Sequence, residues 1–116
     1  MERKSLGMSG EDEAAHFITT LGWKILGRNI HYHFGEIDIL ADSGESIVII
    51  EVKAKTSISH GYAVEMITQA KQRVLRRLAK MVEQAYNKPV RIDVIAIDNY
   101  AEGTQALTHY PYAVEE

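Results

Sequence analysis

Five ionisable side chains lie on or beside the apolar parts of predicted helices and strands. Glu51 and Lys53 directly follow four aliphatic residues and share one face of a predicted strand. Glu11 and Lys71 fall within the apolar faces of two predicted helices, and Asp38 lies on a neighbouring predicted strand. A buried charge costs several kcal/mol unless an opposite charge or a metal compensates it. These five residues are therefore the first candidates for chemistry.

The chemistry that this set supports depends on a metal. Carboxylate oxygens, without cysteine or a paired-histidine motif, favour a hard cation such as Mg²⁺ or Mn²⁺ over zinc. Such a cation binds through one or two carboxylates, water and a substrate phosphate. Lys53 projects beside Glu51 and would orient or activate the attacking water, as phosphodiester hydrolysis requires. The structural alternative is an ion pair between Glu51 and Lys71, or a strand end that emerges into water.

The elements that must position these residues follow from hydrophobic periodicity. The pattern predicts a helix at 9–21, a short or bulged strand from Trp23 toward His33, strands at 35–41 and 46–55 joined by a turn at 42–44, a loop at 56–61, a helix at 66–86 and a strand at 90–97. The β-branched run in 46–55 predicts a central strand covered on both faces. The tail from Asn99 is predicted as an edge strand or a short helix. We therefore expect an α/β fold with a mixed sheet between helices.

The long helix carries most of the basic charge. Five of the 13 Lys and Arg residues lie within positions 71–80, although the net charge is −3. Its apolar face is predicted from residues that recur every three or four positions: Ile67, Ala70, Val74, Leu78, Met81 and Ala85. The opposite face is either a solvated surface or a set of phosphate contacts, and it carries Arg73, Arg76, Arg77 and Lys80.

Composition bounds the remaining possibilities. The 116 residues include no cysteine, which excludes disulfides, thiolate zinc sites and thiol nucleophiles. The longest apolar run, at 47–50, is far too short to span a bilayer. We expect one soluble, cytoplasmic domain over 1–116, with a core at about 10–97 and a C-terminal extension at 98–116. A net charge of −3 by itself counts against a basic nucleic-acid-binding coat.

Several other side chains have a functional and a structural interpretation. His31 and His33 alternate across Tyr32 and are predicted to share one strand face, where they would touch phosphate or metal or simply face water. Asp93 is predicted to form a structural salt bridge with Arg91 or its neighbours. The remaining tyrosines show no spacing typical of a base-stacking platform, and core or surface packing is expected for Tyr62, Tyr86, Tyr100, Tyr110 and Tyr112.

Taken together, these residues resemble a known family. Residues 35–38 (GEID), followed thirteen positions after Asp38 by Glu51-Val52-Lys53, are similar to the D-x(n)-E-x-K core of the PD-(D/E)XK nuclease superfamily. More specific segments extend the match from 10 to 97 and resemble the bacterial YraN-like family, which is similar in fold to archaeal Holliday junction resolvases. Those segments are Gly10-Glu11-Asp12 with Ala14-Ala15, Leu21-Gly22-Trp23, Ile25-Leu26, Arg28-Asn29, 35–40 (GEIDIL), 51–55 (EVKAK), Gly61, Lys71 and 91–94 (RIDV).

The resemblance implies a restriction-endonuclease-like αβββαβ core and assigns roles to single residues. Asp38 and Glu51 would ligate the metal, the Val52 carbonyl would contribute, and Lys53 would position the attacking water. Further roles follow by the same analogy: Glu11 completes the acidic pocket, Lys71 contacts the scissile phosphate or Glu51, and Glu36 supports Asp38 or serves as a second metal ligand. Three positions depart from the usual pattern, namely Ile37 at the proline of the PD motif, Lys55 where arginine is common, and Glu13 where an apolar residue is common.

Three hypotheses follow for function. The first is a nuclease that uses Mg²⁺ or Mn²⁺ and no small-molecule cofactor to cut DNA, with branched or single-stranded DNA as candidate substrates. Lys55, Lys71, His33 and the basic helix face would then contact nucleic acid, and a homodimer would supply two cuts. The second is a nucleic-acid-binding module with little turnover, and the third is a structural or interaction protein that keeps the fold. None of the three requires a membrane.

Overall fold

The computed structural model describes residues 9–55, 67–99 and 105–115. The loop expected at 56–61, Gly61, Tyr62 and Tyr100 lie outside the described residues. The elements run in the order α2 (Gly10–Thr20), β1 (Lys24–Tyr32), β2 (Gly35–Asp42), β3 (Ile47–Lys55), α3 (Gln69–Tyr86), β4 (Val90–Asn99) and β5 (Gln105–Val114). The predicted element order is confirmed, and the tail forms an edge strand.

The strands form one mixed sheet in the order β1-β2-β3-β4-β5. Neighbouring strands are antiparallel except β3 and β4, which are parallel and are joined by the crossover through α3. β3 occupies the centre, and the side chains of Ile47, Val48, Ile49 and Ile50 are fully buried. This burial on both faces is what the continuous β-branched run predicts.

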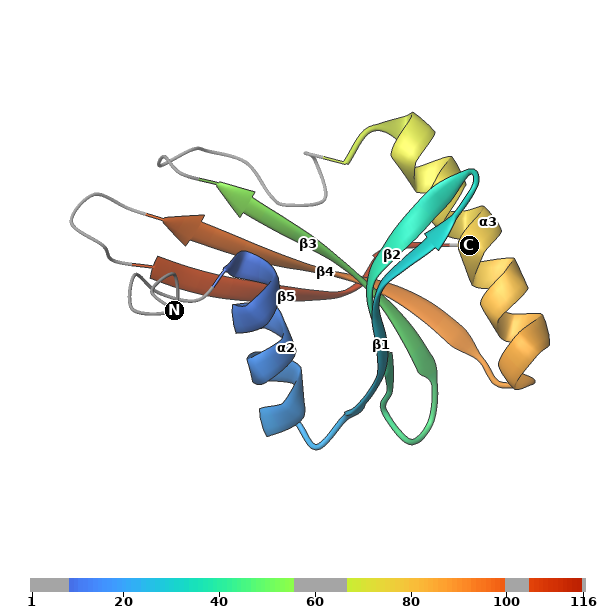
Figure 1. The fold of residues 1–116 in the computed structure, drawn as a ribbon, viewed down its shortest axis with the longest axis horizontal. Coiled ribbons are helices and arrows are strands. Elements are labelled where there is room, and N and C mark those ends of the chain that lie inside the picture. The colour runs from blue at the N-terminus through green and yellow to red at the C-terminus, as the bar shows by residue number, and fades with distance from the viewer. Residues whose placement is uncertain (1–8, 56–66, 100–104, 116) are drawn as a thin grey trace.

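The two described helices cover opposite faces of the sheet (Figure 1). α2 packs Ala14, Ala15 and Ile18 on a cluster that includes Ile50 and Ile97. α3 packs on the other face, where its buried side chains meet the second cluster. Both helices begin at a hydroxyl cap, because Ser9 Oγ accepts from the Asp12 N–H at 3.1 Å and Thr68 Oγ1 accepts from the Lys71 N–H at 3.1 Å.

The apolar face predicted for the long helix is partly wrong. Leu78 is buried as expected, but Ala70, Met81 and Ala85 are exposed. The reason is that Ile67 precedes the cap at Thr68, so a periodicity that starts from Ile67 has the wrong phase. The side chains that α3 does bury are Leu75, Leu78, Ala79 and Val82.

The connection between β1 and β2 also differs from the expectation. β1 ends at Tyr32, and His33 and Phe34 form a two-residue turn before Gly35 pairs with Tyr32. The interpretation that His31 and His33 share one strand face is therefore wrong, because the chain reverses at His33. The predicted bulge in β1 is confirmed by a register shift between Ile25 and Gly27.

No helix among the described residues is both long and apolar enough to cross a bilayer.

Candidate active site

The site lies where the two central antiparallel strands part. Pairing of β2 with β3 runs from Asp42 and Ile47 to Ile39 and Ile50, whereas β3 continues to Lys55 beside β4. Asp38 and Glu51 are the next residues on each strand. Asp38 Oδ2 accepts a hydrogen bond from the Val52 N–H at 2.9 Å. The Asp38 carboxylate therefore takes the place of a backbone carbonyl of β2 as the acceptor for Val52. This bond fixes Asp38 where β2 and β3 separate.

Glu51 has too few partners for a buried carboxylate. The residue is 6% exposed, and its Oε1 atom accepts no hydrogen bond from any described residue. Lys71 Nζ lies 3.6 Å from Oε2, which is longer than the roughly 2.7–2.9 Å of a charge-assisted hydrogen bond. A buried carboxylate oxygen without a donor is uncommon and costly, and among the described residues Lys71 compensates the charge of Glu51 only in part.

Burial and neighbouring negative charge disfavour the ionised form of both carboxylates. Burial raises the pKa of Asp38, and the charges of Glu11 and Glu36 add to the rise, while the Val52 N–H and Lys71 oppose it. Burial likewise raises the pKa of Glu51, the charge of Asp38 raises it further, and Lys71 and Lys53 act in the opposite direction. A cation placed between them would relieve both costs.

Two lysines flank this pair as the sequence predicts. Alternation along β3 places Lys53 on the same face as Glu51, and that face is the one that α3 covers. Lys71 reaches the same carboxylate from the first turn of α3, beside the buried stripe. Among the described residues Lys53 makes no ion pair, and its side chain is half-buried. The strand and the helix thus place both lysines on the α3 face of the sheet, where both charges lower the pKa of Glu51.

Glu11 is brought to the site by contacts that sequence reasoning did not identify. Its Oε1 atom accepts hydrogen bonds from Arg28 Nη2 and Asn29 Nδ2, each at 3.0 Å. Arg28 Nη2 also donates to Asp12 Oδ1 at 2.7 Å. Glu11 lies close enough to raise the pKa of Asp38. α2 approaches the sheet closely at Gly10, where an added Cβ would lie 3.1 Å from Ala54 Cβ.

Asn29 owes its orientation to an unusual backbone. Its φ of 53° lies in the left-handed region, which asparagine tolerates better than most residues. On either side of Asn29, Arg28 pairs with Ile39 and Ile30 pairs with Ile37 of β2. The sequence did contain a signal that Arg28 and Asn29 belong near the site, because this pair is one of the segments that carry the family resemblance.

Glu36 faces a different partner from the one its assigned role requires. Its Oε1 atom lies 3.0 Å from His31 Nδ1, and its side chain is 42% exposed. Glu36 affects Asp38 only through its charge, which raises the pKa of Asp38. Glu36 therefore lies near the site, with His31 as its ion-pair partner.

The donor set can be compared with what a hard cation needs. No group of three or more His, Cys, Asp or Glu side chains with the spacing of a metal site occurs among residues 9–55, 67–99 and 105–115. Mg²⁺ typically takes one or two carboxylates and completes its shell with water and substrate phosphate. Asp38 and Glu51, with an oxygen of Glu51 lacking a donor, fit that requirement. Lys55 ends β3, and its side chain lies outside what the structure describes.

The basic face of α3 is not part of the carboxylate site. Arg73 and Lys80 are exposed, and Arg76 is half-buried. Arg77 instead places its guanidinium carbon 3.8 Å from the centre of the Phe34 ring in the β1–β2 turn. Only Lys71 among the basic residues of α3 pairs with Glu51.

The predicted salt bridge at Asp93 is confirmed and extends further. Asp93 is fully buried and accepts two hydrogen bonds from Arg91, each at 3.1 Å. It also lies 2.7 Å from His109 Nε2 and accepts from the Tyr112 N–H at 3.1 Å. The four groups join β4 to β5 on the α2 face. Because both oxygens of the buried Asp93 carboxylate have hydrogen-bond partners, this cluster has a structural role.

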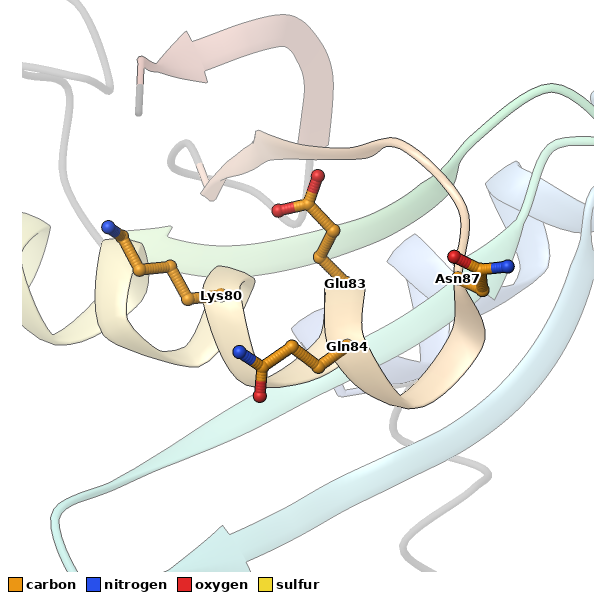
Figure 2. A pocket seen from close by; sticks show the side chains of 4 residues that line it. All are labelled: Lys80, Glu83, Gln84 and Asn87. Atoms are coloured by element: carbon orange, nitrogen blue, oxygen red, sulfur yellow. The ribbon is translucent and has the colours of Figure 1, made fainter.

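A surface cavity at the far end of α3 does not coincide with this chemistry. It has a volume of about 540 Å³, lies at the C-terminal end of α3 and is lined by Lys80, Glu83, Gln84 and Asn87 (Figure 2). The four side chains are exposed. A ligand site typically combines apolar walls with a few convergent polar groups, and this cavity lacks such walls. We therefore assign the candidate site to Asp38 and Glu51.

The fold and the site define a class of protein. It is a mixed α/β domain, consistent with a restriction-endonuclease-like core, in which the buried Glu51 and the half-buried Asp38 lie where two central strands part. The chain belongs to the family described as "Uncharacterised protein family UPF0102", which it matches over residues 10–97. This confirms the resemblance to the YraN-like family. β5 lies beyond the matched segment.

Relatives match over most of their length. The UPF0102 protein of Caldicellulosiruptor saccharolyticus is 42% identical over 100 residues, which cover 84% of this chain and 85% of that protein. The UPF0102 protein of Syntrophotalea carbinolica is 38% identical over 117 residues, which cover 98% and 94%. UPF0102 protein THEYE_A1950 of Thermodesulfovibrio yellowstonii is 44% identical over 103 residues, which cover 85% and 90%.

Proposed function

We propose that this domain is a Mg²⁺- or Mn²⁺-dependent endonuclease that hydrolyses phosphodiester bonds in DNA, with branched or otherwise structured DNA as its substrate class. The observation that carries the proposal is the Asp38–Glu51 pair at the open end of the β2–β3 ladder, with a buried Glu51 oxygen that no described donor reaches. The resemblance of the Asp38, Glu51 and Lys53 pattern to PD-(D/E)XK nucleases supports the same chemistry.

The metal ligands in this proposal come from two strands. Asp38 and Glu51 supply carboxylate oxygens, and the Val52 carbonyl supplies a third. The N–H and C=O of one residue in an extended strand point to the same side. Since the Val52 N–H meets Asp38, its carbonyl is directed toward the same gap. A bound ion would place positive charge at a phosphoryl oxygen and lower the pKa of water.

The remaining residues position the reactants. Lys53, on the face of Glu51, orients the attacking water, and Lys71 offsets the charge of Glu51 and contacts the scissile phosphate. Glu11 completes the acidic pocket, and its carboxylate is held in place by Arg28 and Asn29. Each of these groups comes from a different element, so the fold must form before the site exists. A homodimer would pair two such sites for two cuts.

A second candidate is a nucleic-acid-binding module with little turnover. The observation that favours it is the basic surface of α3, which extends beyond Lys71 to residues that do not touch the carboxylates. A purely structural role accounts less well for the site, because the 3.6 Å pair of Lys71 with Glu51 leaves the other carboxylate oxygen without a donor.

The test is cleavage of labelled single-stranded, duplex and four-way-junction DNA with Mg²⁺ or Mn²⁺. In Asp38→Asn the side-chain oxygen can still accept from the Val52 N–H, but the charge is lost. Glu51→Gln also keeps the shape of the side chain and loses the charge. We expect each variant to lose at least about 100-fold in rate, the scale on which lost metal affinity acts. Asp42→Asn, at the other end of β2, is the matched control and should cut like the wild type.

Metal binding is measured separately by thermal unfolding. A cation that binds the folded state raises the melting temperature in proportion to the logarithm of its concentration. Mn²⁺ should stabilise the wild type and Asp42→Asn but not Asp38→Asn. Equal cutting by all four proteins, or no cutting of any DNA by the wild type with either metal, would contradict the nuclease. Salt-sensitive DNA binding that survives in Asp38→Asn without cleavage would favour the binding module.

A further inference from the structure

The β1–β2 turn and α3 form an aromatic and basic surface that the Asp38–Glu51 site does not use. We call it the hairpin-tip patch, and it consists of Tyr32, His33, Phe34 and Arg77. The Arg77 guanidinium carbon lies 3.8 Å from the centre of the Phe34 ring. The His33 ring meets Phe34 edge-on at 5.2 Å and 79°, and the Tyr32 ring lies 6.0 Å away at 33°. Figure 1 shows the end of the β1–β2 hairpin reaching α3.

The patch is open on its outer side. His33 and Arg77 are exposed, while Tyr32 and Phe34 are half-buried beneath them. A guanidinium with one face on an aromatic ring offers its other face to a second flat group. Among the described residues no second ring covers Arg77, so the stack of Phe34 and Arg77 ends in a cationic plane, and the His33 ring packs on Phe34.

The surroundings of the patch favour a polyanion. α3 has no acidic side chain before Glu83, and its exposed basic residues continue the positive charge on both sides of Arg77. The nearest carboxylate on the hairpin, Glu36, is paired with His31. A flat cationic stacking surface in such a field matches a nucleobase attached to a phosphate backbone.

We propose that the hairpin-tip patch stacks one unpaired nucleobase of the DNA strand that the Asp38–Glu51 site cuts. This inference rests on the proposed function and names the feature of the substrate that the site selects. A base inside a duplex is already stacked on both sides, so only an unpaired base can offer a free face to Arg77. The patch therefore selects single-stranded or unpaired segments over continuous duplex.

The distance between the hairpin-tip patch and the Asp38–Glu51 site is one that a single DNA strand can span. Six residues of α3 separate Lys71, which pairs with Glu51, from Arg77, a rise of about 9 Å at 1.5 Å per residue. Four residues of β2 and the turn separate Asp38 from Phe34, or about 13 Å at 3.3 Å per residue. Phosphates repeat about every 3.4 Å along each strand of a duplex and further apart in an extended strand. The stacked base would thus lie within a few nucleotides of the scissile bond.

The test is binding in EDTA, where no metal-dependent cleavage interferes. Fluorescence anisotropy is recorded with three labelled probes of equal length: a (dT)20 strand, the same strand with abasic sites in place of thymines, and a 20-base-pair duplex. We expect the (dT)20 strand to bind at least about tenfold more tightly than the abasic strand, the scale of one stacked base. The duplex should bind no more tightly than the abasic strand.

Variants separate stacking from charge. Arg77→Lys keeps the charge and loses the plane, so it should weaken (dT)20 binding about tenfold and leave binding of the abasic strand within twofold. Arg73→Lys is the matched control, since Arg73 is exposed on the same helix. It should change neither affinity by more than twofold. Phe34→Ala should act like Arg77→Lys, and its melting temperature reports whether the hairpin stays folded.

The results distinguish this inference from the proposed function. Equal affinity for the (dT)20 and abasic strands, or equal effects of Arg77→Lys and Arg73→Lys, would overturn base stacking even if Asp38-dependent cleavage is observed. Discrimination against the abasic strand that Arg77→Lys removes would support stacking even if no metal-dependent cleavage occurs. An acidic peptide that displaces (dT)20 from Arg77→Lys and wild type equally would show that charge alone is recognised, and would also overturn stacking.

Discussion

Glu51 carries an energetic cost in the folded state, because its buried charge is only partly compensated. Burial and the nearby Asp38 carboxylate raise the pKa of Glu51, and Lys71 at 3.6 Å offsets only part of that cost. The carboxylate is thus held in a form that the folded protein disfavours. Residues at functional sites commonly carry such a penalty, which ligand binding removes.

Replacing Glu51 by glutamine should stabilise the metal-free protein. Glutamine keeps the shape of the side chain and removes the buried charge that Lys71 pairs incompletely. We expect the free energy of unfolding near neutral pH to rise by about 0.5–2 kcal/mol, measured by chemical denaturation in EDTA. The gain should be reversed in Mn²⁺, which stabilises only the wild type. A loss of more than 2 kcal/mol in EDTA would show that Glu51 and Lys71 are a structural pair.

The pH dependence of this gain follows from the direction of the shift. A carboxyl with a raised pKa in the folded state costs nothing below its ordinary pKa, where both states are protonated. The cost grows as the pH rises from the ordinary pKa toward the folded pKa and stays constant above it. The advantage of Glu51→Gln should therefore be largest at neutral pH and shrink toward acid pH.

At the scale of elements, the β1–β2 hairpin is held against α3 by a close approach at Gly35. A Cβ added to Gly35 would lie 2.5 Å from Val74 Cγ1, closer than side chains can pack. Gly35 directly follows Phe34, which lies under Arg77, and it begins the strand that carries Asp38. The geometry of both the site and the hairpin-tip patch therefore depends on the missing side chain at residue 35.

Substituting Gly35→Ala should push the hairpin away from α3. We expect a loss of about 1–3 kcal/mol in unfolding free energy, as is typical of overpacked positions. Val74→Ala should relieve the clash, so the double variant should lose less than the sum of the two single losses. The measurement is a double-mutant cycle by denaturant unfolding. Strict additivity of the two losses would show that Gly35 and Val74 do not clash.

At the scale of the whole molecule, a buried ionic cluster holds the last strand in place. Asp93 on β4 joins Arg91 and His109, and the Arg91 guanidinium lies 5.0 Å from the Trp23 ring and 4.7 Å from the Tyr112 ring. Trp23 follows α2, so the cluster links the first helix to the last two strands. The cluster therefore connects a residue near the beginning of the described chain with residues near its end.

Removing the Asp93 carboxylate should destabilise the whole domain. Asp93→Ala leaves Arg91 largely buried without its partner, and we expect a loss of about 3–5 kcal/mol. Asp42→Ala, which breaks a half-exposed pair with Lys88 at 3.1 Å and removes the acceptor of the Gly44 N–H, is the control and should cause a much smaller loss. Urea unfolding of both variants provides the comparison. Similar small losses in the two would show that Asp93 does not link the strands energetically.

The sequence by itself determined the order of the elements and the identity of the charged residues near the core. Periods of two and of 3.6 residues separate strands from helices, and they showed that Lys53 shares a face with Glu51 and that Lys71 turns toward the sheet. Periodicity was less reliable where an element begins, as the phase of α3 and the turn at His33 show. Both errors arise at boundaries, where a few residues decide the direction of the chain.

Only the tertiary structure decided which distant residues meet. The end of the β2–β3 ladder places Asp38 on the Val52 N–H, the left-handed Asn29 helps to hold Glu11, and Phe34 lies under Arg77. These contacts depend on where strand pairing stops and how the helices cross the sheet. Local periodicity carries no information on either, because the pattern of one element is the same whatever lies against it.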